Sequence, residues 1–180
     1  MLIIGIDPGP EQSAYAVIDT DSGFPGKIIA FGKGKENNVL EFIYKSINGY
    51  LGHEKHLCIE MPASYGMAVG RSVFETCAQV GRFEISLNHN FNINKTFRLY
   101  RKSKNDNGIP SICMSICKNN KSGDSNIRAA IIDLYPATGG GKVPQIGTKK
   151  EPGPLYGVSK DVWAALAVAL TYQIYLENIY

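Results

Sequence analysis

The stretch that decides the fold is residues 2–9, LIIGIDPG. An apolar run rich in branched side chains stops at an acid and a Pro-Gly turn, which is typical of a buried β-strand. Two further apolar runs follow at residues 14–18 and 27–31, with turn residues between them. Connections this short predict an antiparallel meander of three strands.

The rest of the chain continues this meander with helical and strand patterns. Apolar residues at helical spacing predict helices at 38–50, 69–87, 110–117, 124–134 and 160–176, and short apolar runs predict strands at 57–59 and 97–101. We expect an Asn pair to cap the first helix and Ser159 to cap the last. The order predicts an α/β fold in one domain, residues 1–180, with a mixed five-stranded sheet flanked by helices on both faces.

The net charge of the 180 residues is only +3, but it is unevenly distributed. Residues 95–150 hold 11 basic and 3 acidic side chains, and the segments on either side are acidic. The overall composition, 44% hydrophobic and 19% charged, excludes collagen-like, disordered and disulfide-scaffold proteins. The four cysteines lack zinc spacing and are expected to be free thiols. Without a signal-peptide pattern or a membrane-length apolar run, we expect a cytoplasmic protein with no membrane partner.

Three acidic residues stand at the ends of predicted elements. Asp7 ends the first strand, Glu60 ends an apolar strand, and Asp161 begins a nearly apolar helix. Alone, each has a simpler explanation: a turn cap for Asp7, an ion pair for Glu60, and a favourable helix dipole for Asp161. Together, carboxylates at adjacent strand ends and on a docked helix can converge on one point. Such oxygen clusters bind hard divalent ions, so we predict a metal site.

These segments resemble Holliday junction resolvases of the RuvC type. The resemblance is carried by IGIDPG at residues 4–9 with AYAVI at 14–18, by the strand-end acid Glu60, and by DVWAALAVA at 161–169. It covers almost the whole chain, although the middle and the Gly/Pro-rich segment match less clearly. It implies a ribonuclease H-like fold and a divergent relative, which if phage-encoded would act in the cytoplasm of a bacterial host.

The resemblance also implies an activity. RuvC-type enzymes cut DNA at four-way junctions as symmetric dimers, with two divalent ions in each active site. It makes Asp7, Glu60 and Asp161 the catalytic and metal-binding residues, with Mg2+ as cofactor and Mn2+ as substitute. We expect Asp7 to bridge the two ions, and Glu60 and Asp161 to serve one each. Branched DNA and a second copy of the chain are the expected partners. The length and apolar face of the predicted helix at residues 69–87 make it the expected dimer interface.

One position departs from the family's pattern. The family usually has two metal ligands three residues apart on the last helix, and here Asp161 holds the first position while Ala164 holds the second. Three carboxylates can still hold two ions, with water and phosphate oxygens as the remaining ligands. Glu11 and Glu151 are weaker candidates for a fourth acid. The alternatives are an active three-acid enzyme, which we favour, and a weakened or inactive one.

The basic segment predicts a DNA-binding track beside the metal site, with a solvated charged surface as the alternative. Residues 138–158 contain six glycines and three prolines, a composition typical of a functional or mobile loop. We expect this loop to adapt to a DNA backbone, and an aromatic side chain after Glu60 to stack on unpaired bases. Lys160 is a further candidate for neutralising charge in the reaction. The predicted DNA-binding residues are Tyr65, Arg98, Arg101, Lys102, Lys118, Lys121, Lys149 and Lys150.

Three functional classes are compatible with these motifs to different degrees. The first is a metal-dependent endodeoxyribonuclease that resolves branched DNA, and the second is a module of the same fold that binds junctions without cutting them. The third is an actin-like sugar kinase, which opens with a similar Gly-Ile-Asp motif but needs about twice this length. No phosphate-binding P-loop motif is present, so we expect no nucleotide cofactor.

Overall fold

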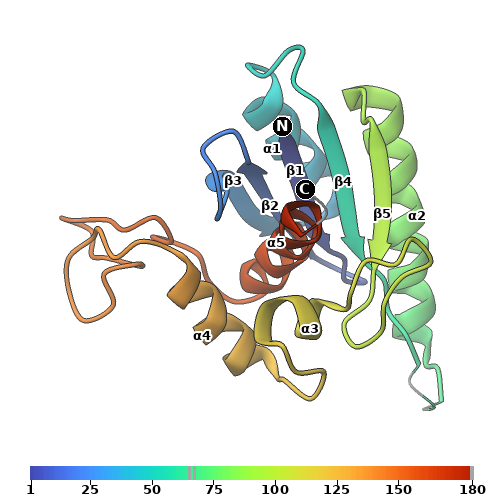
Figure 1. The fold of residues 1–180 in the computed structure, drawn as a ribbon. Coiled ribbons are helices and arrows are strands. Elements are labelled where there is room, and N and C mark those ends of the chain that lie inside the picture. The colour runs from blue at the N-terminus through green and yellow to red at the C-terminus, as the bar shows by residue number, and fades with distance from the viewer. Residues whose placement is uncertain (65, 67, 179–180) are drawn as a thin grey trace.

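The computed structural model describes residues 1–64, 66 and 68–178. Its described part contains one mixed five-stranded sheet in the order β3-β2-β1-β4-β5 (Figure 1). The strands are β1 (Leu2–Asp7), β2 (Ser13–Asp19), β3 (Lys27–Gly34), β4 (Lys55–Glu60) and β5 (Lys95–Leu99). The first three form an antiparallel meander, and β4 and β5 run parallel to β1. The predicted sheet is confirmed.

Helices cover both faces of this sheet (Figure 1). Alternate residues of β1 point to opposite faces, so Leu2, Ile4 and Ile6 pack in one core and Ile3 in the other. The first core is closed by α1 (Glu36–Ile47) and α2 (Arg71–Phe91). The second is closed by α3 (Ile112–Cys117), α4 (Asp124–Leu134) and α5 (Val162–Glu177). The α/β class with helices on both faces is therefore confirmed.

Gly5 lets α5 lie directly on the middle strand. A Cβ atom at Gly5 would fall 2.3 Å from the carbonyl oxygen of Ala165 and 2.9 Å from the Cβ of Ala169. Real Cβ atoms do not approach other atoms so closely, so only glycine on the strand and alanines on the helix allow this contact. The close packing explains the alanine-rich sequence of α5. It also brings the start of α5, at Asp161, toward the end of β1.

Several element boundaries differ from the sequence predictions. The first helix begins at Glu36 with Lys35 as its N-cap residue and no side-chain cap bond, so the predicted Asn cap is wrong. β5 begins at Lys95, opposite His56 of β4, and ends at Leu99. Both ends lie two residues earlier than in the predicted strand at 97–101, so Arg101 follows the strand. The N-cap residue of α5 is Asp161 and not Ser159. None of the described helices is both long and apolar enough to cross a lipid bilayer.

Residues 138–158 form a compact loop that projects beyond α4 (orange in Figure 1). Its glycines allow close backbone contacts: a Cβ at Gly153 would lie 2.2 Å from the carbonyl oxygen of Pro144. The backbone amides of Gly153 and Leu155 donate to the carbonyl oxygens of Ile146 and Gln145. The glycines therefore serve close packing, and three of them, Gly141, Gly147 and Gly157, also adopt the positive φ that favours glycine. That the loop adapts to a DNA backbone stays a prediction. We call this segment the glycine loop.

Candidate active site

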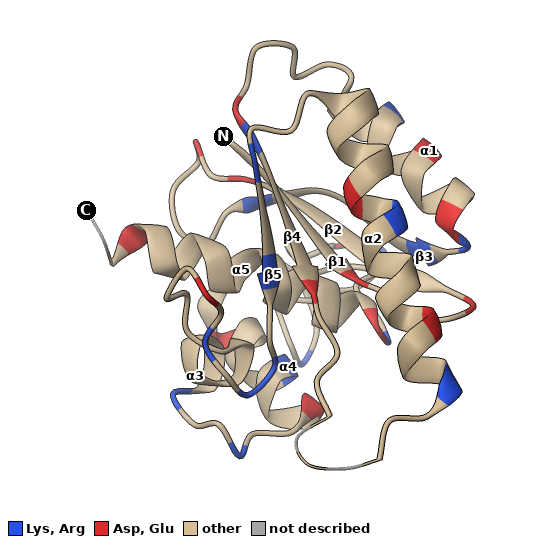
Figure 2. Ribbon diagram, turned by 90° about the vertical axis from the view of Figure 1, so that its right-hand side faces the viewer, with Lys and Arg blue, Asp and Glu red and all other residues tan. Residues whose placement is uncertain are grey.

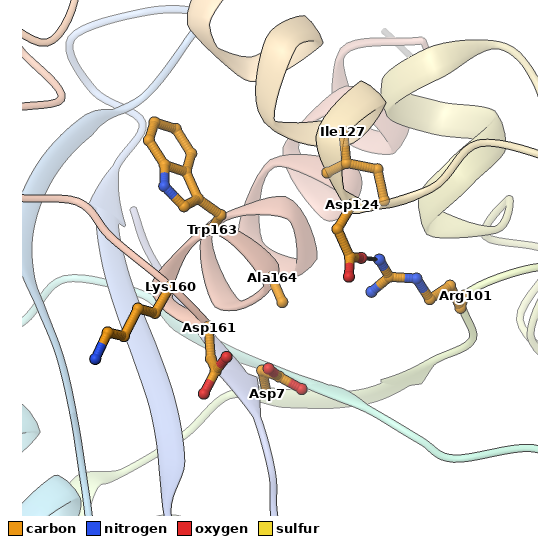
Figure 3. A pocket seen from close by; sticks show the side chains of 8 residues that line it. All are labelled: Asp7, Arg101, Asp124, Ile127, Lys160, Asp161, Trp163 and Ala164. Carbon is orange, nitrogen blue, oxygen red and sulfur yellow. Dashed lines mark ion pairs between the residues drawn. The ribbon is translucent and has the colours of Figure 1, made fainter.

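The sheet brings the carboxylates of Asp7 and Glu60 together. They end neighbouring parallel strands, and the residues before them, Ile6 and Ile59, are paired in the β1–β4 ladder. Parallel strands place their carboxyl ends at one edge of a sheet, where ligand sites of α/β folds commonly lie. Asp161 comes from the start of α5, and Figure 3 shows its carboxylate beside that of Asp7. The structure thus brings together the three acids that the sequence singles out.

Burial and mutual repulsion make this a strained group of acids. The pKa of Asp7 is raised from 3.8 to about 7, first by burial and then by the charges of Glu60 and Asp161. Burial also raises the pKa of Glu60, against the opposing effect of Arg101. The buried Oε2 atom of Glu60 has no hydrogen-bond partner among the described residues. An acidic group in this condition favours a bound cation.

Two basic side chains from distant segments contact these acids. The Nη1 atom of Arg101 lies 3.6 Å from Oε1 of Glu60, and its Nη2 atom forms an ion pair with Asp124. Lys33 forms an ion pair with Asp161. The sequence predicts Arg101 as a DNA-binding residue, and the structure places it in the acidic site. Its location just after β5 explains this, because β5 adjoins β4 and ends beside Glu60.

Sequence reasoning misses Lys33 and Asp124 as members of the site. The β-ladder contains a signal for Lys33, because Asp7 pairs with Ala14 and Ala14 pairs with Lys33. The predicted third strand stops at residue 31, three residues before the observed end of β3. Asp124 has only the sequence pattern of a helix cap. No local pattern shows that α4 would begin at the site, because this depends on how α4 packs against α5.

A cavity of about 350 Å3 opens at this point (Figure 3). It is lined by Asp7, Arg101, Asp124, Ile127, Lys160, Asp161, Trp163 and Ala164. Lys160 has a left-handed backbone conformation, with φ of +49°, which non-glycine residues rarely adopt. Such strain occurs most often at functional sites. The cavity joins acidic oxygens to several cations, a combination suited to metal ions and a phosphate.

The acids fit divalent ions by their chemistry. No group of three His, Cys, Asp or Glu side chains within the described residues is arranged to hold a metal ion as it stands. The donors are nevertheless carboxylate oxygens, as Mg2+ prefers. The unpartnered oxygen of Glu60 and the raised pKa of Asp7 indicate missing positive charge. The residue types and their electrostatics therefore fit divalent metal ions. The side chains would have to move for an ion to bind, because they are not arranged around one point in this structure.

The other predicted DNA-binding residues lie at separate places. Arg98 makes two 2.7 Å hydrogen bonds to Glu84 of α2. Lys118 borders a different cavity near Phe24, and the exposed Lys102 and Lys121 lie near α3, where Figure 2 shows several basic positions on the loops. The glycine loop carries two more, Lys149 and Lys150, both exposed. Tyr65 lies outside the described residues.

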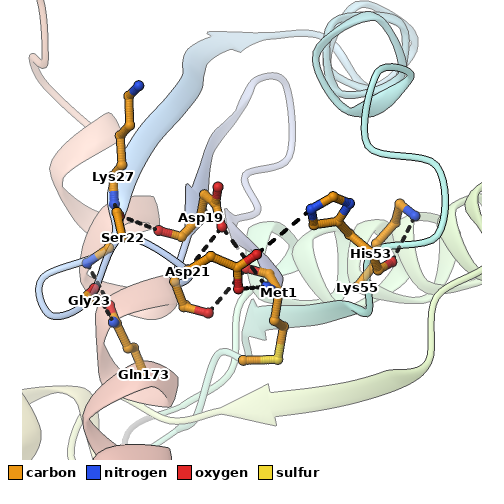
Figure 4. A network of polar contacts seen from close by, with 11 residues as sticks. Met1, Asp19, Asp21, Ser22, Gly23, Lys27, His53, Lys55 and Gln173 are labelled. Carbon is orange, nitrogen blue, oxygen red and sulfur yellow. Dashed lines mark hydrogen bonds and ion pairs between the residues drawn. The ribbon is translucent and has the colours of Figure 1, made fainter.

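A network of polar contacts at the opposite end of β1 has a structural role. The amino group of Met1 forms ion pairs with Asp19 and Asp21, and His53 lies 3.7 Å from Asp21 (Figure 4). Gln173 of α5 donates to the carbonyl oxygen of Gly23 in the same region. These contacts hold the start of β1, the β2–β3 turn and α5 together, so this end of the sheet is fixed by the chain itself.

Comparison with solved structures shows which known proteins share this fold. Thermus thermophilus RuvC matches with a TM-score of 0.66 and 12% identity, covering 99% of this chain and 96% of that one. The same protein in complex with a Holliday junction substrate matches with a TM-score of 0.63, 12% identity and the same coverage. The Fowlpox virus resolvase with Holliday junction DNA matches with a TM-score of 0.51 and 14% identity, covering 98% and 99% of the two chains.

These similarities extend over nearly the whole chain at low sequence identity. No protein-family model matches the sequence, and no curated protein matches it significantly. The chain therefore shares the RuvC-like, ribonuclease H-like fold of Holliday junction resolvases, as the resemblance implied.

Proposed function

We propose that this chain is a RuvC-type endodeoxyribonuclease that hydrolyses phosphodiester bonds in branched DNA with the help of divalent metal ions. The observation that carries the proposal is the grouping of Asp7, Glu60 and Asp161 beside a cavity that Asp7 and Asp161 line. Burial and the charges of the other two acids raise the pKa of Asp7, and one buried oxygen of Glu60 has no hydrogen-bond partner among the described residues. The shared fold supports it, because two of the similar structures contain Holliday junction DNA.

Each acid has a distinct position toward the ions. The charges of Glu60 and Asp161 both act on Asp7, so these three carboxylates would together hold the ions, with Asp7 as the residue common to them. Bound Mg2+ or Mn2+ would lower the pKa of the attacking water and stabilise the leaving 3′-oxygen. Arg101 and Lys33 neutralise Glu60 and Asp161 in the protein alone. Lys160 also lines the cavity, but Figure 3 shows its ammonium directed away from Asp7 and Asp161, so contact with a phosphate there would require its side chain to turn.

A second copy of the chain is the proposed protein partner, and α2 is the proposed contact surface. Phe74 and Ile85 are exposed on this helix, at 66% and 73%. Gly81 between them has open space where a Cβ would stand, which leaves room for a second helix to approach. A symmetric junction suits a symmetric dimer. Phe74→Glu should convert a dimer to monomers in light scattering, and a wild-type protein that is monomeric at micromolar concentration would refute this contact.

The decisive experiment compares cleavage and binding on defined substrates. The protein is incubated with a synthetic four-way junction, a replication fork and a linear duplex, with Mg2+ or Mn2+. We expect paired symmetric nicks in the junction, lost in Asp7→Asn while junction binding is kept. Glu41→Gln, on the exposed surface of α1, is the matched control and should cut normally. Binding without cleavage with either metal would contradict the proposal and favour the binding module, which Ala164 makes the second candidate.

A further inference from the structure

The cavity has an acidic residue that the three-acid site does not include. Asp161 and Ala164 lie one turn apart on the α5 side, and Ala164 offers only a methyl group. Across from them, Asp124 reaches the cavity from the first turn of α4 (Figure 3). A carboxylate is thus present in the same cavity as the alanine, but it comes from another helix.

Helix packing fixes the position of Asp124. The helix α4 packs on α5 in the second core, through Ile127 and Ile131. The guanidinium of Arg128 lies 5.3 Å from the ring centre of Trp163, which adds a cation–π contact between the two helices. The side chain of Asp124 is 89% exposed and its carboxylate is paired with Arg101, while the first turn of α4 keeps its backbone at the cavity.

A single guanidinium connects Asp124 to the buried part of the site. Arg101 contacts Glu60 through Nη1 and Asp124 through Nη2, so both carboxylates lie beside the same planar group. The guanidinium of Arg101 between Glu60 and Asp124 marks a place in the site where a positive charge is stabilised. The second oxygen of Glu60 remains buried and without a hydrogen-bond partner among the described residues. This unsatisfied acceptor indicates that Arg101 alone does not complete the coordination of the site.

We propose that Asp124 is the fourth acidic ligand residue of the metal site, supplied by α4 in place of the ligand missing at Ala164. Arg101 pairs with both Glu60 and Asp124 in the structure, and Asp124 would leave this ion pair to hold a metal ion. The proposal rests on the proposed metal-dependent function and assigns one more residue to it. It explains how a site with alanine at position 164 keeps four carboxylates.

The test measures metal binding to the full-length protein without DNA. Isothermal titration calorimetry gives the affinity and number of Mn2+ ions, and the Mn2+ electron paramagnetic resonance spectrum reports the bound fraction. We expect Asp124→Asn to lower the affinity for one Mn2+ ion by roughly tenfold, which is within the range known for groups that support metal sites. The double variant Asp124→Asn with Ala164→Asp should recover most of this affinity, because a carboxylate then reaches the cavity from α5. Asp133→Asn, an exposed acid at the other end of α4, is the matched control and should bind as wild type.

Arg101 provides the test that separates a ligand from an ion-pair partner. If Asp124 only kept Arg101 away from Glu60, its removal would have no effect once Arg101 is replaced by Met. If Asp124 is a ligand, adding Asp124→Asn to the Arg101→Met protein should lower its Mn2+ affinity by the same roughly tenfold factor. Unchanged Mn2+ binding in Asp124→Asn, no recovery through Ala164→Asp, or a loss that vanishes with Arg101→Met would each overturn the proposal.

Asp7→Asn distinguishes this inference from the proposed function. If Asp7→Asn loses Mn2+ and Asp124→Asn does not, the metal site stands and the role of Asp124 falls. If the wild-type protein binds no Mn2+ and Asp7→Asn behaves identically, the proposed metal-dependent function itself fails.

Discussion

At the cavity, Asp7 and Glu60 are buried close to each other, and the cations that contact the acids, Arg101 and Lys33, come from other segments. In the glycine loop, Lys142, Lys149 and Lys150 are exposed and form no ion pair with any described residue. The acids of the first region are partly buried and in contact with cations, whereas the second region has three exposed lysines and a single acid, Glu151. Under the proposed function, metal ions would bind at the first region and DNA phosphates at the second.

The largest expected effect is the release of strain at the cavity in Asp7→Asn. The pKa of Asp7 is about 7 in the folded protein and 3.8 in the unfolded chain, so folding favours the protonated acid. Its contribution to stability is full below pH 3.8 and is lost as the pH rises through about 7. Without metal, Asn should raise the free energy of unfolding by roughly 2 to 4 kcal/mol at about pH 8 and hardly change it at about pH 4.

Urea unfolding at both pH values, in EDTA, measures this difference. Equal free energies of unfolding for wild type and Asp7→Asn at the higher pH would contradict this prediction, because ionised Asp7 would then not destabilise the folded protein. Glu41→Gln should show no such pH-dependent gain.

The next effect concerns the packing of the glycine loop. In Gly153→Ala the new Cβ would meet backbone atoms of Pro144 and Gln145, which cannot move aside as a side chain can. We expect about 2 kcal/mol of destabilisation, seen as faster amide hydrogen exchange within residues 138–158. Gly49→Ala, where a Cβ has open space, is the control. Unchanged exchange in Gly153→Ala would mean that the loop is as adaptable as its composition predicts.

The lysines of this loop give the third effect. Replacing Lys149 and Lys150 with Ala should weaken junction binding about tenfold at physiological salt and make its salt dependence shallower by up to about two units of log–log slope. Mn2+ affinity should stay the same, because neither lysine lies at the cavity. Fluorescence anisotropy over a salt series measures both quantities. An unchanged slope would remove the loop from the DNA-binding surface.

Arg98 gives the smallest effect and the sharpest contrast with these lysines. Its guanidinium already has an internal acidic partner in Glu84, unlike the lysines of the loop. Arg98→Met should leave junction affinity and its salt slope unchanged, and cost below about 1 kcal/mol of stability as for other exposed ion pairs. A loss of affinity as large as that of the Lys149/Lys150 variant would show that an ion-paired arginine also serves DNA, and the contrast would fail.

The sheet and its three acids are predictable because they depend on local and periodic signals. The meander follows from apolar runs with short turns, and strand-end acids are visible as charges that interrupt such runs. The resemblance to resolvases adds the order of the motifs. The partners of those acids are not predictable in this way. Lys33 reaches Asp161 only through the register of three strands, which apolar runs and turn residues alone do not determine.

The charged middle segment shows a second limit of sequence reasoning. Net charge by segment groups Arg98, Arg101 and Lys149 as one basic track. In the structure Arg98 pairs with Glu84 of α2, Arg101 links Glu60 to Asp124, and Lys149 is exposed on the glycine loop. Whether a cation faces solvent or an internal acid depends on tertiary packing. Glycine-rich composition is ambiguous for the same reason, since it is shared by mobile loops and by tightly packed ones.

The contact of Gly5 with Ala165 and Ala169 has a consequence for the precision of the site. Because backbone meets backbone there, no rotamer lies between β1 and α5 that would allow their separation to vary. The van der Waals contact between main-chain atoms therefore sets the distance between the start of α5 and the end of β1. The distance between Asp7 and Asp161 therefore depends on uncharged residues, Gly5 on β1 and Ala165 and Ala169, which lie about one and two helical turns beyond Asp161.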